Sequence, residues 1–190
     1  MDAEDPPVTR GAPVTDLPSY DSRADILAHI HQVRDRLDVF AAELLRRGTA
    51  HDASKLSDAE KPAFDLVTPL LAGVTYGSPE FRALEERVRP TLKHHYQHNS
   101  HHPEFYGERG IAGMDLFDVV EMICDWIASA ARQPGNAVNL AYNVDLFGID
   151  SQLASILANT LERWPRAAPM PPPAPPLQSA AALRPEGPHR

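Results

Sequence analysis

The chain has 190 residues, of which 43% are hydrophobic, and this is enough for one domain with an apolar core. Its formal net charge of −8 argues against a general affinity for nucleic-acid backbones or anionic membranes. The single cysteine excludes an internal disulfide, and no apolar run approaches the ~20 residues that span a bilayer. Because the acidic, proline-broken N-terminus is unlike a signal peptide, we expect a cytoplasmic protein.

The two ends of the chain lack the apolar periodicity of folded elements. Residues 1–20 hold four prolines, and residues 165–190 hold nine of the nineteen in the chain. Such segments favour extended, solvated conformers. We therefore expect a disordered arm over 1–20, a folded domain over 21–164 and a disordered tail over 165–190. The tail is alternatively a docking segment for an aromatic groove on a protein partner.

Every segment of the expected domain has helical spacing, and none alternates like a half-buried strand, so the fold class is all-α. The first helix is predicted from Ser22, as its cap, to Arg47, with Gly48 ending it. Further helices are predicted over 58–71, with bends near its prolines, and over 79–98, 115–132 and 150–163.

Eight of the nine histidines lie between residues 29 and 102. On the first helix His29 flanks the apolar stripe, whereas His31 lies nearer the solvent side. His29 is therefore the better inward-facing ligand and His31 the reserve, although a single inward histidine is more often a hydrogen-bonded core residue.

The pair His51-Asp52 follows the first helix, in a segment where an irregular turn lets both side chains point inward. A neutral imidazole and a carboxylate are ligands for divalent metals, and this pair predicts such a site. Alternatively, Asp52 caps the following turn. Lys55 either steadies a phosphate group or pairs with Asp58.

A second histidine-dense segment runs from residue 93 to residue 104. His94, His95 and His98 are predicted to end a helix, and His101 and His102 lie in the loop that follows. His94 and His98 are one helical turn apart, so they can face one ion or one anion. The alternative is a solvent-exposed cluster that binds metal adventitiously.

The helix predicted over 115–132 carries a narrow acidic stripe of Asp118, Glu121 and Asp125 with apolar residues on both sides. Buried carboxylates are costly unless they are paired or bound to metal. Because histidines are available to share an ion, we favour metal binding. The alternative is a carboxylate–arginine network with Arg132, which lies on the same stripe.

These residues resemble the HD superfamily of metal-dependent phosphohydrolases, whose pattern is a first-helix histidine, a His-Asp pair and a later helix aspartate. The resemblance places these metal ligands at His29, His51, Asp52 and Asp125, and implies a helical bundle of about five to seven helices. Members with two metals add histidines in between, a role open to His94, His95, His101 and His102. The glycine-tyrosine-proline signature of cyclic-dinucleotide phosphodiesterases is absent, which argues against that activity.

The chain from about residue 29 to residue 160 also resembles an uncharacterised bacterial and phage family that is related to this superfamily. The stretches that carry this second resemblance are Tyr76-Gly77-Ser78, His94-His95-Tyr96, His101-His102-Pro103-Glu104 and Met114-Asp115-Leu116-Phe117-Asp118.

The HD resemblance implies hydrolysis of a small phosphoester, such as a nucleotide, by water activated on manganese, iron, cobalt or zinc. One ion is expected and a second is left open. Glu121 or Asp118 would orient or deprotonate the water, while Lys55, His94 and His95 would hold phosphate charge. Three alternatives remain: an HD-type oxygenase with paired irons, a non-catalytic binding module, and a buried polar network without metal.

Overall fold

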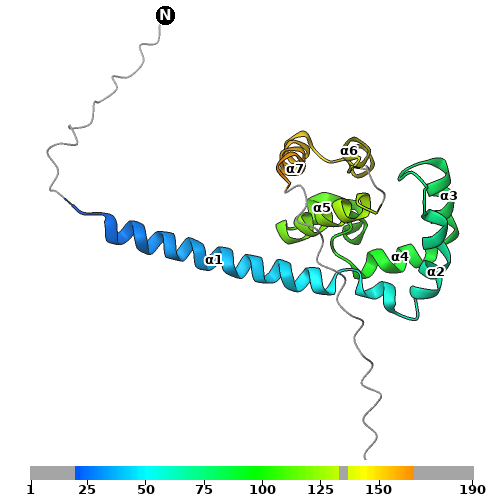
Figure 1. Cartoon of the computed structure of the whole chain (residues 1–190), viewed down its shortest axis with the longest axis horizontal. Coiled ribbons are helices and arrows are strands. Elements are labelled where there is room, and N and C mark those ends of the chain that lie inside the picture. The colour runs from blue at the N-terminus through cyan, green and yellow to red at the C-terminus, as the bar shows by residue number, and fades with distance from the viewer. Residues whose placement is uncertain (1–19, 133–136, 165–190) are drawn as a thin grey trace, which may run out of the picture. The chain divides into compact units, whose positions relative to one another are not determined.

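A computed structural model describes residues 20–132 and 137–164, and every regular element within these ranges is helical, which confirms the all-α prediction (Figure 1). The described chain divides into two compact units after Gly148. Except for Tyr20, the arm predicted over 1–20 lies outside the described residues, as does the whole tail predicted over 165–190. None of the described helices combines the length and the hydropathy that a membrane-spanning segment requires.

Helix α1 spans Arg23–Ala50, so the predicted stop at Gly48 is wrong. A glycine permits a helix to end but does not force it, and here the helical path ends at His51, whose ψ is 128°. The C-terminal part of α1 packs on α5, where the rings of Phe40 and Phe117 stack with centroids 4.4 Å apart.

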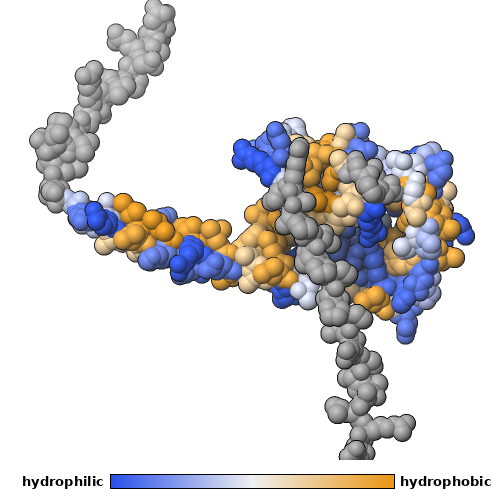
Figure 2. All heavy atoms as spheres, viewed as in Figure 1, coloured by the Kyte–Doolittle hydropathy of each residue, from blue (hydrophilic) through white to orange (hydrophobic). Residues whose placement is uncertain are grey.

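The N-terminal part of α1 leaves its apolar stripe open to solvent, as Figure 2 shows. The side chains of this stripe are 43–62% exposed; they are Ile26, Ile30, Val33 and Leu37. Helical periodicity thus identified the apolar face correctly, but α5 covers only the part of that face nearest residue 50.

The chain between α1 and the second histidine segment forms short helices. These are the 3-10 helix η2 (Ala53–Leu56), α2 (Lys61–Val67) and the 3-10 helix η3 (Thr68–Leu71). The single helix predicted over 79–98 is in fact two, α3 (Pro79–Arg87) and α4 (Arg89–His98). Val88 has φ −115° and ψ 17°, and Pro90 removes a backbone donor just after this break.

After α4 come the 3-10 segment η4 (Pro103–Gly113), α5 (Leu116–Ala130) and α6 (Leu140–Phe147). Asp115 and Asp118 form a capping box that begins α5 close to the predicted start. Helix α6, which was not predicted, begins at the side-chain cap of Asn139 and ends at the left-handed Gly148. The second unit contains α7 (Ser151–Arg163), capped by Asp150.

The interior of the first unit is unusually polar. Its buried apolar side chains are Val67, Val88, Met122 and Ile123. Four ionisable side chains are also buried, with exposed fractions of 0–2%: Glu60, His95, His101 and Asp118. Because burying such groups costs free energy, their arrangement has to be explained by the partners that they meet.

Candidate metal centre

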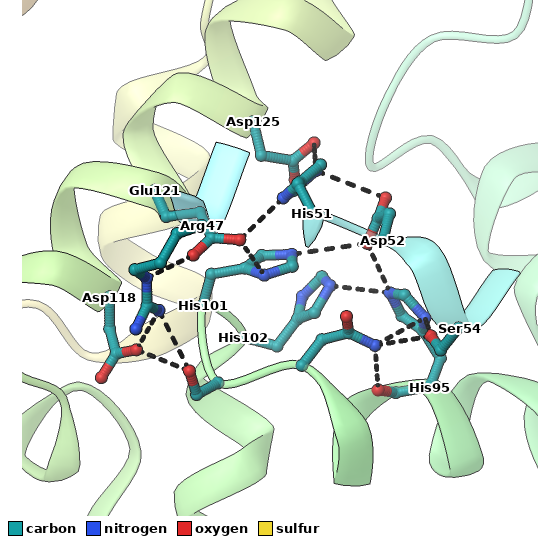
Figure 3. Close-up of polar contacts among 12 residues, drawn as sticks. Arg47, His51, Asp52, Ser54, His95, His101, His102, Asp118, Glu121 and Asp125 are labelled. Carbon is teal, nitrogen blue, oxygen red and sulfur yellow. Dashed lines mark hydrogen bonds and ion pairs between the residues drawn. The ribbon is translucent and has the colours of Figure 1, made fainter. Parts of the chain in front are cut away.

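Four separate segments bring histidines and carboxylates to one place in the first unit (Figure 3). The end of α1 and the following turn supply His51 and Asp52, α4 supplies His95, and the loop before η4 supplies His101 and His102. Helix α5 adds Glu121 and Asp125 from its acidic stripe.

The turn after α1 explains how two adjacent residues point to the same centre. His51 leaves the helix with an extended ψ of 128°, and Asp52 is left-handed at φ 56° and ψ 14°. Asp52 is the one non-glycine residue with positive φ in the described ranges. Such a conformation is unfavourable outside glycine and often marks a functional position.

Glu121 fixes the orientation of two histidines. Its Oε1 atom lies 2.9 Å from His51 Nδ1 and 3.1 Å from His101 Nδ1. An ionised carboxylate only accepts hydrogen bonds, so each Nδ1 carries the proton that it donates. In their neutral forms both imidazoles then present an unprotonated Nε2 atom on the opposite side of the ring.

Glu60 fixes the orientation of the His95 ring in the same way. The fully buried Glu60 carboxylate accepts a 2.9 Å hydrogen bond from His95 Nδ1 and a 3.0 Å bond from Ser54 Oγ. His95 Nε2 consequently faces the interior of the cluster. A histidine that gives its second ring proton to a carboxylate is the usual arrangement of a metal ligand.

Ring nitrogens of three histidines converge with one oxygen of Asp52 at the centre of the cluster. Asp52 Oδ1 lies 3.1 Å from His95 Nε2 and 3.6 Å from His101 Nε2, and His95 Nε2 lies 3.0 Å from His102 Nε2. Two ligands that share one ion at ~2.1 Å are themselves about 3 Å apart. Asp52 Oδ1 and His101 Nε2 are buried and make no hydrogen bond with the described residues.

Two overlapping groups of residues could each hold an ion. In each group, one ligand atom per residue lies within 4.8 Å of the others. The first group is Asp52, His95, His101 and His102; the second is His51, His101 and Asp125. Asp52 Oδ2 also faces the second group, at 3.4 Å from His51 Nε2. The cluster therefore has ligands for one ion and a geometry compatible with two.

The electrostatic field of the cluster favours positive charge. Contacts with Asp125 and Glu121 raise the pKa of His51 to about 10 against the opposing effect of burial. Burial alone would raise the pKa of Asp52, but His95 and Lys55 hold it well below its usual range. His102, in contrast, has its pKa lowered to about 3 by burial and by its histidine neighbours, so it is neutral and able to bind a cation.

Arg47 anchors Glu121 from the side away from the histidines. Its Nε atom donates to Glu121 Oε2 at 2.7 Å, and its Nη2 atom donates to Asp118 Oδ1 at 2.5 Å. Ser100 and Tyr106 also donate to Asp118, at 2.6 and 2.5 Å. The arginine that pairs with the acidic stripe is thus Arg47 and not Arg132, which was the arginine considered from the sequence.

The predicted site residues fall into three sets. The cluster brings together His51, Asp52, His95, His101, His102, Glu121 and Asp125, with Lys55 at its edge. His94 contacts Glu60 but lies in none of the groups around Asp52. His29, expected as the first-helix ligand, is exposed on α1 and belongs to no ligand group in the described part of the chain, as is also true of His31.

Two of the expected catalytic residues are already fully engaged in the network. Both oxygens of Glu121 accept hydrogen bonds, as described above, and both oxygens of Asp118 do so as well, since Oδ2 also accepts from the Asp115 amide. Every oxygen of the two carboxylates thus has a hydrogen-bond partner within the protein, as is expected of positioning residues. Arg47 and Glu60 were missed by sequence reasoning, because each is a charged residue in a helical segment without local sign of burial.

The described residues form an all-helical fold with a histidine–carboxylate cluster whose ligand atoms could hold a divalent metal. A family model, described as "Family of unknown function (DUF5662)", matches residues 18–163, and the chain belongs to this family. This confirms the predicted membership of an uncharacterised family. No curated protein and no solved structure matches the chain.

Proposed function

We propose that this protein is a metal-dependent phosphohydrolase related to the HD superfamily, with His51, Asp52, His95, His101, His102 and Asp125 as its metal ligands. The observation that carries the proposal is that three imidazoles donate hydrogen bonds through Nδ1 to the carboxylates of Glu121 and Glu60. Their Nε2 atoms are thereby directed at Asp52 and Asp125, in the tautomer that binds metal.

A proton in place of the metal is the competing explanation. In that case His95 would be a cation bridging Glu60 and Asp52, and the cluster would be a purely structural ion-pair network. Asp52 Oδ1 and His101 Nε2 are buried and make no hydrogen bond with the described residues, which favours the metal, because a proton network gains most when every buried atom is hydrogen-bonded.

The position of Lys55 favours a substrate that carries a phosphate group. Its ammonium lies 2.5 Å from Asp52 Oδ2 and 5.1 Å from the centre of the Phe64 ring, and its side chain is 32% exposed. It therefore extends from the cluster towards solvent, where it can hold a phosphate oxygen beside the metal ligands. Arg47 is less suited to this role, because its Nε and Nη2 atoms already donate to Glu121 and Asp118.

In the reaction that we propose, the chain supplies binding and orientation. A divalent ion held by the six proposed ligands would supply Lewis-acid activation of a phosphoryl oxygen and of the attacking water. Glu121 and Glu60 hold three ligand rings in the required tautomer, and Lys55 neutralises charge on the transferred group.

The first experiment is elemental analysis of the purified, untagged protein, followed by a phosphoester screen with the metal found. We expect near-stoichiometric metal in the wild type and in His31→Ala, and its loss in His51→Ala and Asp52→Ala. In the screen, Lys55→Met should raise KM for a nucleotide or aryl phosphate, whereas Lys61→Met, on the exposed side of α2, should not. Full metal retention by Asp52→Ala would defeat the ligand assignment.

The two overlapping ligand groups favour one alternative, an HD-type oxygenase with paired irons. Two iron ions per chain, an optical band of a bridged iron pair and substrate-dependent oxygen consumption would support it. Phosphate release with a single ion, and no oxygen uptake, would exclude it in favour of the hydrolase.

A further inference from the structure

A second pair of histidines lies on α4, outside the central cluster. The rings of His94 and His98 are stacked, with centroids 4.1 Å apart and planes inclined by 24°. Glu60, which also holds His95 of the central cluster, accepts a 2.8 Å hydrogen bond from His94 Nδ1 through its other oxygen. His98 Nδ1 in turn contacts the His94 carbonyl oxygen at 2.7 Å.

These contacts fix the tautomer of both rings. The Glu60 carboxylate and the His94 carbonyl only accept hydrogen bonds, so each Nδ1 atom carries a proton. Nε2 is then the unprotonated nitrogen of each neutral ring. The rings are nearly parallel and lie one helical turn apart, and one nitrogen of each ring lies within 4.8 Å of one nitrogen of the other. Two histidines at positions i and i+4 are the spacing that chelates a metal on one face of a helix.

We propose that His94 and His98 form a second metal site, separate from the central cluster and open to solvent. One ligand atom from each of Glu60, His94 and His98 lies within 4.8 Å of the others. His94 is 39% exposed and His98 is exposed, whereas Glu60 is fully buried. The buried carboxylate orients the first imidazole, and the ion is bound from the solvent side.

The ligand chemistry selects the class of ion. Two neutral imidazoles with open positions favour borderline transition metals, and the usual order of affinity places Cu²⁺ above Ni²⁺ and Zn²⁺. Ca²⁺ and Mg²⁺ prefer oxygen ligands and should not compete. An ion held by two protein nitrogens keeps positions for water or for an anionic ligand.

The test uses the full chain in an Asp52→Ala/His101→Gln background, which removes at least one ligand from each of the two groups of the central cluster. Cu²⁺ or Zn²⁺ is titrated against a competing chromogenic chelator, and the frozen Cu²⁺ complex is examined by electron paramagnetic resonance. We expect one ion per chain, with nitrogen hyperfine structure from two imidazoles. His94→Gln and His98→Gln should each weaken binding at least tenfold and reduce the signal to one nitrogen.

The matched control is His31→Gln, which also removes one exposed helical histidine and should leave both readouts unchanged. Circular dichroism checks that each variant remains helical. Equal affinities for His98→Gln, His94→Gln and the Asp52→Ala/His101→Gln background would overturn the second site. This site does not depend on the proposed function: metal lost on Asp52→Ala tests the central cluster, and metal lost on His98→Gln tests the outer pair.

Discussion

Arg47 offers a decisive test of the network behind the histidine cluster. Replacing it with methionine keeps the apolar part of the side chain and removes the guanidinium from Asp118 and Glu121. The side chains of these three residues are 16%, 3% and 12% exposed, so both carboxylates would lose their cation in a largely dry environment.

Breaking a buried ion pair by removing one partner costs about 3–5 kcal/mol. Because the Arg47 guanidinium is partly open to water, we expect the lower end of this range for Arg47→Met. One kcal/mol lowers the melting temperature of a chain of this size by about 2–4 °C, so the expected decrease is roughly 6–12 °C. The measurement is thermal unfolding followed by circular dichroism, with a chelator present so that bound metal does not contribute.

The neighbouring Arg46 provides a matched control on the same helix. It is hydrogen-bonded to Glu43, but its side chain is 66% exposed, and surface ion pairs contribute little to stability. Arg46→Met should therefore melt within about 2 °C of the wild type. If the two methionine variants melted at the same temperature, the buried network would not stabilise this fold and the reasoning would be refuted.

Tyr106→Phe removes the phenol that donates to Asp118, whose pKa is lowered in the folded protein by Ser100 and Tyr106 against the opposing effect of burial. A carboxylate with a lowered folded pKa stabilises the protein above its unfolded pKa of about 3.9, and this stabilisation is lost as the pH falls through the folded value. In urea unfolding, wild type and Tyr106→Phe should thus differ by about 1.5–3 kcal/mol at pH 7, and the difference should shrink as the pH falls through the folded pKa of Asp118. His29→Gln should retain the metal content of the wild type in elemental analysis, whereas His101→Gln should lose it; equal loss in both would restore His29 as a ligand. Glu121→Gln should keep the number of bound ions but weaken their affinity by about 10–100-fold in a chelator competition, and an unchanged affinity would contradict its positioning role.

The acidic stripe of α5 was predictable because helical geometry is local. Once the helix was recognised, the spacing of Asp118, Glu121 and Asp125 placed them on one face, and the cost of burying carboxylates implied a cationic partner. The partner itself was not predictable. Arg47 lies 71 positions before Asp118, and a basic residue in the last turn of a helix is common on protein surfaces.

His29 is the opposite case: its position on the face of the helix was predicted correctly, but its expected place at the centre was wrong. It does flank the apolar stripe of α1, as the helical spacing indicates. Periodicity reports which face of a helix is apolar, however, and not how much of its length a neighbouring element covers. Since α5 meets α1 near Phe40, the stripe around Ile30 remains exposed, and His29 lies there with it.

The difference at the first helix bears directly on the resemblance to the HD superfamily. In that pattern α1 would contribute a ligand, whereas here the end of α1 contributes Arg47, which holds Glu121. Glu121 in turn orients His51 and His101, so α1 acts on the centre through a carboxylate instead of touching it. The centre does not lack ligands as a result, because the loop before η4 supplies two histidines within reach of Asp52. The proposed kinship therefore rests on the His-Asp pair and the aspartate of α5, and under that proposal the histidines after α4 would take the place of the missing first ligand.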